Sequence, residues 1–239
     1  MKFIDLLNEG INDKYLFKAV FLAGGPGSGK SFIGNTMFKG LDAKFLNSDD
    51  IFEAKLKRNN IPLKIDDKNV EQFKKQMEVR GRAKELTKSK QNLLVNGMLP
   101  LVIDGTGKDF KKIKKQKDAL EAIGYETGLV FVNTSLNVAK QRNLERSRTV
   151  PEEVVVKSWN DVQKNLGKFQ SAFNGNFTIV DNNNILTKDQ IQKLGIKLHR
   201  KALKFMDSPL KNPKGISTIS MLKKLGGKLL SDLPDGTFK

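Results

Sequence analysis

The chain contains no cysteine and only one histidine among its 239 residues. Without cysteine it can form neither disulfides nor thiolate metal sites, which favours a reducing intracellular compartment. A Ser-His-Asp hydrolase or a multi-histidine metal site would depend on His199 alone. That residue lies among Lys197, Arg200 and Lys201, so we expect it to face solvent. Both classes of site are therefore set aside.

Long hydrophobic runs are absent too, and no segment approaches the length of a membrane-spanning helix. The first 13 residues carry Asp5, Glu9 and Asp13 within a short amphipathic pattern, so they lack the unbroken apolar stretch of a signal peptide. We therefore expect a cytoplasmic protein without a membrane partner.

Acidic residues are few: 26 stand against 43 basic ones, giving a net charge of +17 and a pI near 9.9. This excess indicates either a polyanionic partner or a solvated lysine surface, and the sequence leaves both open. Only seven of the basic residues are arginines, and five of these fall in two groups. The groups are Arg80 with Arg82, and Arg142 with Arg146 and Arg148. Guanidinium groups are the preferred donors for phosphate oxygens.

What is present is a complete phosphate-binding motif. Residues 24–31 read Gly-Gly-Pro-Gly-Ser-Gly-Lys-Ser, they follow an apolar run at 19–23, and they precede a helical pattern at 32–39. In such a loop the backbone N–H groups surround a β-phosphate, the lysine bridges the β- and γ-oxygens, and the serine holds Mg²⁺. The residues assigned to nucleotide binding are Gly25, Pro26, Gly27, Ser28, Gly29, Lys30 and Ser31, with Ser31 also a magnesium ligand.

Five short apolar or β-branched runs predict strands, and helical stretches separate them. The runs are Lys18 to Ala23, Ala43 to Asn47, Leu101 to Asp104, Thr127 to Asn133 and Asn176 to Asp181. This alternation predicts an α/β protein of the P-loop NTPase fold, with about five mostly parallel strands and helices on both faces. We assign residues 1–204 to one P-loop domain and 205–239 to a basic C-terminal tail that docks on the domain, binds a protein partner or contacts nucleic acid.

Residues 52–98 form a charged helical insertion, with Gly81 as an expected break. The insertion either covers an acceptor site, carrying Arg80 and Arg82 toward it, or packs on the sheet, and both alternatives stay open. A further helix is expected to begin at Thr149 as N-cap, with Glu152 completing a capping box.

Carboxylates follow the second and third predicted strands. Asp49 and Asp50 close the second strand, and Asp49 is the candidate general base, the alternative being that an aspartate caps the next helix. Asp104 ends the third strand and is the candidate Mg²⁺ ligand through water. Arg142 and Arg146, one helical turn apart, are expected to close on the transferred phosphoryl group, and Arg148 to bind the nucleotide.

Together these motifs resemble the kinase domain of phage polynucleotide 5′-kinases. The resemblance covers about residues 16–181 and rests on GGPGSGKS, NSDD at 47–50, VIDGTG at 102–107, RNLER at 142–146 and Val150-Pro151. It implies that Asp49 is the general base and that Arg142 and Arg146 bind phosphates. The chain departs from the pattern at Phe52, where that family carries an arginine, and it has no DxDGT phosphatase module.

Zeta-toxin-type kinases of nucleotide sugars are similar as well, through the style of the glycine-rich loop, the Asp-Gly-Thr strand end and Gly124-Tyr125 before the fourth strand. We therefore expect a kinase that uses ATP and Mg²⁺ to phosphorylate a hydroxyl group. The first-choice acceptor is the 5′-hydroxyl of a polynucleotide or nucleotide, and a nucleotide sugar is the alternative. A non-catalytic ATP-binding module with a basic tail is the alternative from another class. Asp49 separates the two, because a module that only binds does not need it.

Overall fold

A computed structural model describes residues 14–64, 69–146, 149–183 and 187–224. Its centre is a five-stranded parallel sheet in the order β2-β3-β1-β4-β5. The strands are β1 Lys18–Ala23, β2 Lys44–Leu46, β3 Leu101–Asp104, β4 Glu126–Asn133 and β5 Phe177–Asp181. Each lies within two residues of the strand predicted from sequence, and the predicted α/β P-loop NTPase fold is confirmed. Parallel order places the carboxyl ends of all five strands at one edge.

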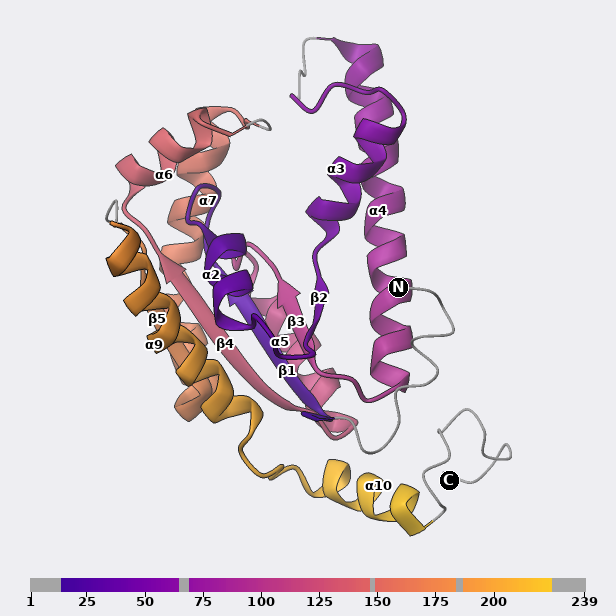
Figure 1. Ribbon diagram of the computed structural model, residues 1–239. Helices are drawn as coiled ribbons and strands as arrows, with labels where there is room; N and C mark the ends of the chain where they lie inside the picture. The colour runs from indigo at the N-terminus through magenta and orange to yellow at the C-terminus, as the bar shows by residue number, and fades with distance from the viewer. Residues whose placement is uncertain (1–13, 65–68, 147–148, 184–186, 225–239) are drawn as a thin grey trace.

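Helices cover both faces of the sheet (Figure 1), which explains why β1 is buried along its whole length. Its apolar side chains pack on both sides, whereas a half-solvated strand would alternate apolar with polar residues. The helices are α2 Lys30–Met37, α3 Ser48–Arg58, α4 Val70–Asn96, α5 Phe110–Ala122, α6 Leu136–Leu144, α7 Glu152–Lys164, α8 Leu166–Phe173, α9 Lys188–Met206 and α10 Pro213–Lys224. Within the described ranges, none of them combines the length and the apolar character that crossing a bilayer requires.

The two faces have separate cores. Helices α2 and α9 pack on one face, where Ile33, Leu198 and Met206 meet Val20 and Val130. His199 on α9 is partly buried there, and its Nδ1 donates to the Met37 carbonyl (3.1 Å), so the expectation that it faces solvent is wrong.

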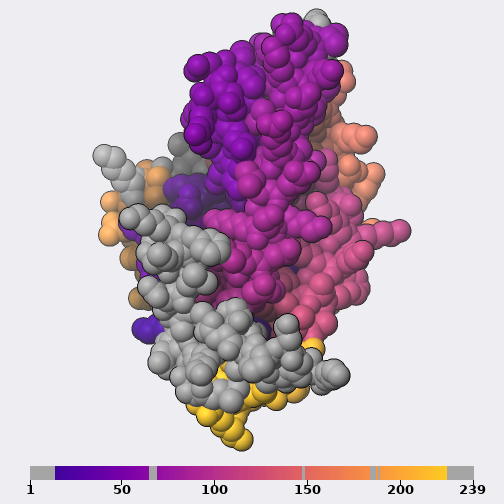
Figure 2. Space-filling view, turned by 90° about the vertical axis from the view of Figure 1, so that its right-hand side faces the viewer, coloured from indigo at the N-terminus to yellow at the C-terminus, as the bar shows by residue number. Residues whose placement is uncertain are grey.

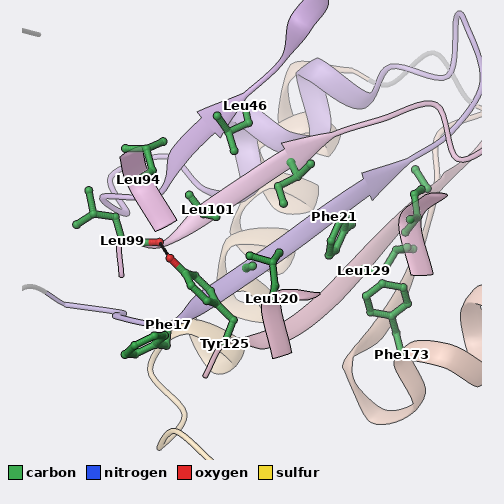
Figure 3. Packing of buried hydrophobic residues seen from close by; sticks show 14 of the residues in the cluster. Phe17, Phe21, Leu46, Leu94, Leu99, Leu101, Leu120, Tyr125, Leu129 and Phe173 are labelled. Atoms are coloured by element: carbon green, nitrogen blue, oxygen red, sulfur yellow. Dashed lines mark hydrogen bonds between the residues drawn. The ribbon is translucent and has the colours of Figure 1, made fainter. Parts of the chain in front are cut away.

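The opposite face carries the larger core, built by α4, α5, α7, α8 and α10. Figure 3 shows Phe21 near Phe173 in this core, with ring centroids 5.6 Å apart, and Tyr125 donating its hydroxyl to the Leu99 carbonyl (3.0 Å). Burial raises the pKa of Tyr125 far above its usual value, so this buried hydroxyl stays protonated and keeps its hydrogen bond.

Helices α3 and α4 form an antiparallel pair that projects beyond the sheet (Figures 1 and 2). A small core of Phe52, Leu56, Val79 and Ala83 joins them. The predicted break at Gly81 is wrong, because α4 runs unbroken from Val70 to Asn96. Gly81 is exposed with open space around it, and its helical neighbours and the packing on α3 outweigh the roughly 1 kcal/mol by which glycine weakens a helix.

Residues 207–224, expected in the basic tail, dock at the amino-terminal end of the sheet. Buried Lys18 pairs with Glu126 and also donates to Ser208 Oγ (3.0 Å), while Glu126 accepts from the Lys211 backbone N–H (2.8 Å). Leu222 of α10 lies in the larger core. Residues 207–224 therefore contact the rest of the described chain through these groups, and residues 225–239 lie outside the described part.

The docking of α10 depends on the close approach of two glycines. A Cβ on Gly124 (φ +116°) would lie 2.8 Å from both Cα and N of Gly215. We expect Gly124→Ala to lower the free energy of unfolding by about 2–4 kcal/mol, measured by urea denaturation. Gly40→Ala is the matched control, since Gly40 also has positive φ (+76°) but open space around it, and should cost about 1–2 kcal/mol. Equal losses for the two variants would contradict this packing.

Candidate functional site

The glycine-rich loop connects β1 to α2 and can be built only with glycine at two of its positions. Gly27 (φ +75°) and Gly29 (φ +82°) take the left-handed backbone conformation. A Cβ on Gly27 would lie 2.3 Å from the carbonyl oxygen of Ala139, and one on Gly29 would lie 2.3 Å from Nδ2 of Asn182. The neighbouring elements therefore approach the loop as closely as its glycines permit.

Three side chains from distant parts of the sequence brace this loop. The Ser28 carbonyl accepts hydrogen bonds from Asn182 Nδ2 (2.8 Å) and from Thr134 Oγ1 (3.2 Å). Trp159 Nε1 in turn donates to the Thr134 carbonyl (2.6 Å). Because each partner is itself held, the loop conformation is established before a ligand arrives. Sequence analysis noted Asn182 only as part of an asparagine triplet.

Lys30 is the first residue of α2 and folds back over the loop. Its Nζ donates to the Gly24 carbonyl (2.7 Å) and lies 3.4 Å from that of Gly25. Burial lowers the pKa of Lys30, the negative charges of Asp104 and Asp49 act against this shift, and the positive charge of Arg146 adds to it. An ammonium held by backbone carbonyls is placed to exchange these contacts for phosphate oxygens.

Two further loop residues have polar groups that suit a ligand. Ser31, in the first turn of α2, is exposed. Ser28 Oγ is buried and has no hydrogen-bond partner among the described residues. Such a group loses solvation without compensation unless a ligand or water supplies the partner.

Asn47 connects the ends of β2 and β3. As N-cap of α3, its Oδ1 accepts from the Asp49 backbone N–H (2.8 Å). Its Nδ2 donates to Asp50 Oδ1 (2.9 Å) and to Asp104 Oδ2 (3.1 Å). The cap is therefore Asn47, and the alternative that an aspartate caps this helix is wrong. Both aspartates lie in the first turn, where the helix dipole favours negative charge.

Asp104 ends β3 with one oxygen held and one unsatisfied. Oδ2 accepts from Asn47, while Oδ1 is buried without a hydrogen-bond partner among the described residues. Burial raises the pKa of Asp104, Lys30 opposes the shift, and Asp49 and Asp50 reinforce it. The described residues hold no group of three histidine or carboxylate side chains placed to ligate a metal ion, so the unsatisfied oxygen of Asp104 fits a water ligand of a divalent cation.

The raised pKa of Asp104 predicts a pH-dependent cost of folding. The folded-state pKa lies above the usual 3.8, so the cost is absent below that pH and grows as the pH rises through the folded pKa. We expect Asp104→Asn to increase the free energy of unfolding by about 0.5–2 kcal/mol at pH 7 in the absence of Mg²⁺. The gain should shrink toward zero near pH 4. Urea denaturation of both proteins across this range measures it, and a gain independent of pH would contradict the assignment.

Asp49 faces the same edge from the first turn of α3. Its charge contributes to the pKa shifts of both Lys30 and Asp104, which places it near these groups. Arg80 of α4 lies beside it, with Nη2 3.9 Å from Asp49 Oδ1. The insertion therefore brings Arg80 to the predicted general base, whereas Arg82 is exposed on another side of α4.

Arg142 and Arg146, which we expected to act together, have different surroundings. Arg142, in α6, donates from Nη1 to the Asn182 carbonyl (2.7 Å), next to the glycine-rich loop. Helix α6 ends at Leu144, so Arg146 does not continue the helical face, and its charge instead lowers the pKa of Lys30 and of Asp104. Arg148 lies outside the described residues.

The segment after α6 is held at its base by Asn143. Its Nδ2 donates to the Val150 carbonyl (2.8 Å) and its Oδ1 accepts from the Val150 N–H (3.2 Å). Helix α7 begins at Glu152 with Pro151 as N-cap, so the predicted capping box from Thr149 is wrong. Proline fixes φ for a helix start and has no N–H to satisfy, so the helix begins two residues later than expected.

The chain is similar to one protein-family model and to several solved structures. The family model AAA_33, described as an AAA domain, matches residues 20–169. No curated protein sequence matches the chain. Among solved structures, a chain of the PezAT chromosomal toxin–antitoxin system of Streptococcus pneumoniae is 18% identical, with a TM-score of 0.55 over 84% of this chain and 92% of that one.

A chain of the AvrRxo1-ORF1:ORF2 complex with ATP is 13% identical, with a TM-score of 0.56 over 92% of this chain and 88% of that one. At such low identity these two structures support the fold alone.

Proposed function

The chain belongs to the AAA_33 family, described as an AAA domain, and from this premise we propose that it is a P-loop kinase that transfers the γ-phosphoryl group of ATP to a hydroxyl acceptor. The observation that carries the proposal is the hydrogen-bonding of Asn47, which holds Asp104 and the first turn of α3 together at the sheet edge that also carries Lys30. A module that only bound nucleotide would need the glycine-rich loop but not a carboxylate directed at an acceptor.

In this proposal the residues divide between binding and chemistry. The loop N–H groups and Lys30 bind the phosphates, and Arg146 neutralises charge that develops during transfer. Ser31 and Asp104 would hold Mg²⁺, which supplies charge neutralisation on the β- and γ-phosphates when bound. Asp49 accepts the proton of the attacking hydroxyl.

The first-choice acceptor is the 5′-hydroxyl of a polynucleotide or nucleotide. The net charge of +17 and the agreement of the NSDD and RNLER motifs with phage polynucleotide kinases support it. A nucleotide sugar is the second candidate, supported by the zeta-toxin style of the loop and the Asp-Gly-Thr strand end. Both acceptors suit the same catalytic groups, because phosphoryl transfer depends mainly on positioning and charge stabilisation.

Incubation of the full chain with γ-labelled ATP and Mg²⁺ tests the proposal. The acceptor panel contains 5′-hydroxyl oligonucleotides, nucleosides, nucleotides and UDP-sugars. We expect label on one acceptor class, and the class that is labelled decides between the two candidates. Label found solely in inorganic phosphate, with every acceptor unmodified, would contradict the kinase proposal.

A further inference from the structure

Helix α10 is held at the amino-terminal end of the sheet, opposite the candidate site (Figure 1). On its inner side, Leu222 lies in the larger core and Gly215 lies close to Gly124. The residues that lead into α10 are held as well, because Asn212 Nδ2 donates to the Glu121 carbonyl (2.7 Å). One side of α10 therefore has a fixed position, and the other side faces outward.

The outward side of α10 carries a surface groove of about 520 Å³. The residues that line it lie on one face of the helix and are Pro213, Ile216, Ser217, Ser220, Met221 and Lys224. Ile216 is 47% exposed, and Met221 is partly exposed. A helix that buries one side in the core and carries apolar side chains on the other fits a further apolar surface.

The charge around the groove is of one sign. Helix α10 contains three lysines, at positions 214, 223 and 224, and no acidic residue. A second copy of α10 packed on this face would bring lysines against lysines, and such like-charge contacts are unfavourable. The occupant that suits the groove therefore combines apolar with acidic residues.

Residues 1–13 have such a sequence. They carry three acidic residues against one lysine. The apolar residues Phe3, Leu7 and Ile11 recur at every fourth position, a pattern that places them on one face of a helix. The same spacing places the acidic residues on the opposite face; they are Asp5, Glu9 and Asp13. The pattern predicts an apolar face for the groove and a negative charge that complements the lysines of α10.

These residues are joined to the described chain beside α10. A Cβ on Gly124 would lie 3.2 Å from Cε1 of Phe17 and 2.8 Å from N of Gly215, so Phe17 and the first turn of α10 border the same point. Leu16 lies in the same core as Leu222. A helix of 13 residues is about 20 Å long and α10 is about 18 Å long, so residues 1–13 can span the groove.

We propose that residues 1–13 occupy the groove on α10, with Phe3, Leu7 and Ile11 directed at Ile216 and Met221. The contact is intramolecular, and a short connection of this kind gives an effective concentration on the order of millimolar. It lies outside residues 20–169, which the family model matches, and it does not depend on the proposed function.

Disulfide cross-linking of the full chain tests this contact, because the chain contains no cysteine of its own. The test variant combines Leu7→Cys with Ser220→Cys in the groove, and the control combines Leu7→Cys with Ala119→Cys. Ala119 is exposed on α5, two residues before Glu121, so it lies near α10 but outside the groove. In oxidised glutathione we expect the intramolecular disulfide to form about 10- to 100-fold faster in the test variant. Non-reducing electrophoresis and intact mass measure it.

Two isoleucines of matched exposure supply a second comparison. Ile216→Glu puts a carboxylate into the groove, and Ile196→Glu makes the same change on α9, where the isoleucine is 46% exposed. Within the test variant, Ile216→Glu should slow disulfide formation to the rate of the control pair, because it removes an apolar contact and repels an acidic segment. Ile196→Glu should leave the rate unchanged. Urea denaturation checks the fold of each variant, and Ser217→Cys replaces Ser220→Cys where the latter lowers stability.

Equal rates in the two cysteine pairs, or a rate that Ile216→Glu does not change, would overturn the inference. Disulfides that form only between molecules would assign the groove to a second copy and would overturn it as well. None of these outcomes bears on the kinase proposal, which the transfer assay tests separately.

Discussion

Replacing Asp49 by asparagine is expected to lower kcat by about 10²–10⁴-fold, the range typical of a lost general base. Asparagine keeps the shape of the side chain but cannot accept the proton of the acceptor hydroxyl. Nucleotide affinity should change little, because in the proposed function the loop and Lys30 bind the phosphates. Trp159, the only tryptophan, donates to Thr134 beside the loop, so its fluorescence can follow ATP binding separately from turnover.

Asp50→Asn is the control for this prediction. Asp50 lies in the same first turn of α3, so its substitution removes an equal charge from the helix N-terminus. An asparagine carbonyl can still accept from Asn47 Nδ2, so the link to Asp104 should persist. We expect kcat to fall by less than about tenfold. Similar losses in the two variants would show that charge at the helix terminus matters and would remove Asp49 from its role as base.

The strands could be predicted from sequence because each is a short apolar run with a clear end, and in a parallel sheet both faces are buried. Helix boundaries were less accurate, and the reasons are local. Gly81 is compatible with an exposed helical position, and packing between α3 and α4 carries the helix past it. The start of α7 depends on the hydrogen bonds between Asn143 and Val150, which link residues seven apart.

At the candidate site, three residues assigned from continuous motifs, Lys30, Asp49 and Asp104, lie near one another, and their roles stay predictions. The sequence did not predict how they are held. Asn182 braces the glycine-rich loop from 154 positions away along the chain, and no local pattern contains that contact. Arg80 reaches Asp49 from a different helix, so its place opposite Phe52 follows only from the packing of α3 on α4.

The two described arginines of the RNLER segment are expected to differ in function. Arg146→Ala should lower kcat by about 10²–10³-fold with little change in stability, because its exposed side chain acts through charge near Lys30 and Asp104. Arg142→Ala should instead lower the free energy of unfolding by about 1–3 kcal/mol, because it removes the charged donor to the Asn182 carbonyl. Steady-state kinetics and urea denaturation of both variants measure the two effects.

The direction of the difference follows from how each guanidinium is held. Arg142 is tied to the backbone carbonyl of Asn182, the residue whose side chain braces the loop, so its loss should weaken the loop and raise the KM for ATP. Arg146 lies beyond the end of α6, where its charge opposes that of the Lys30 ammonium and favours ionised Asp104. A positive charge there stabilises negative charge that grows during transfer, which affects kcat more than ground-state binding. Equal kcat losses for Arg142→Ala and Arg146→Ala, with ATP affinity unchanged in both, would mean that both arginines act on the transferred phosphoryl group.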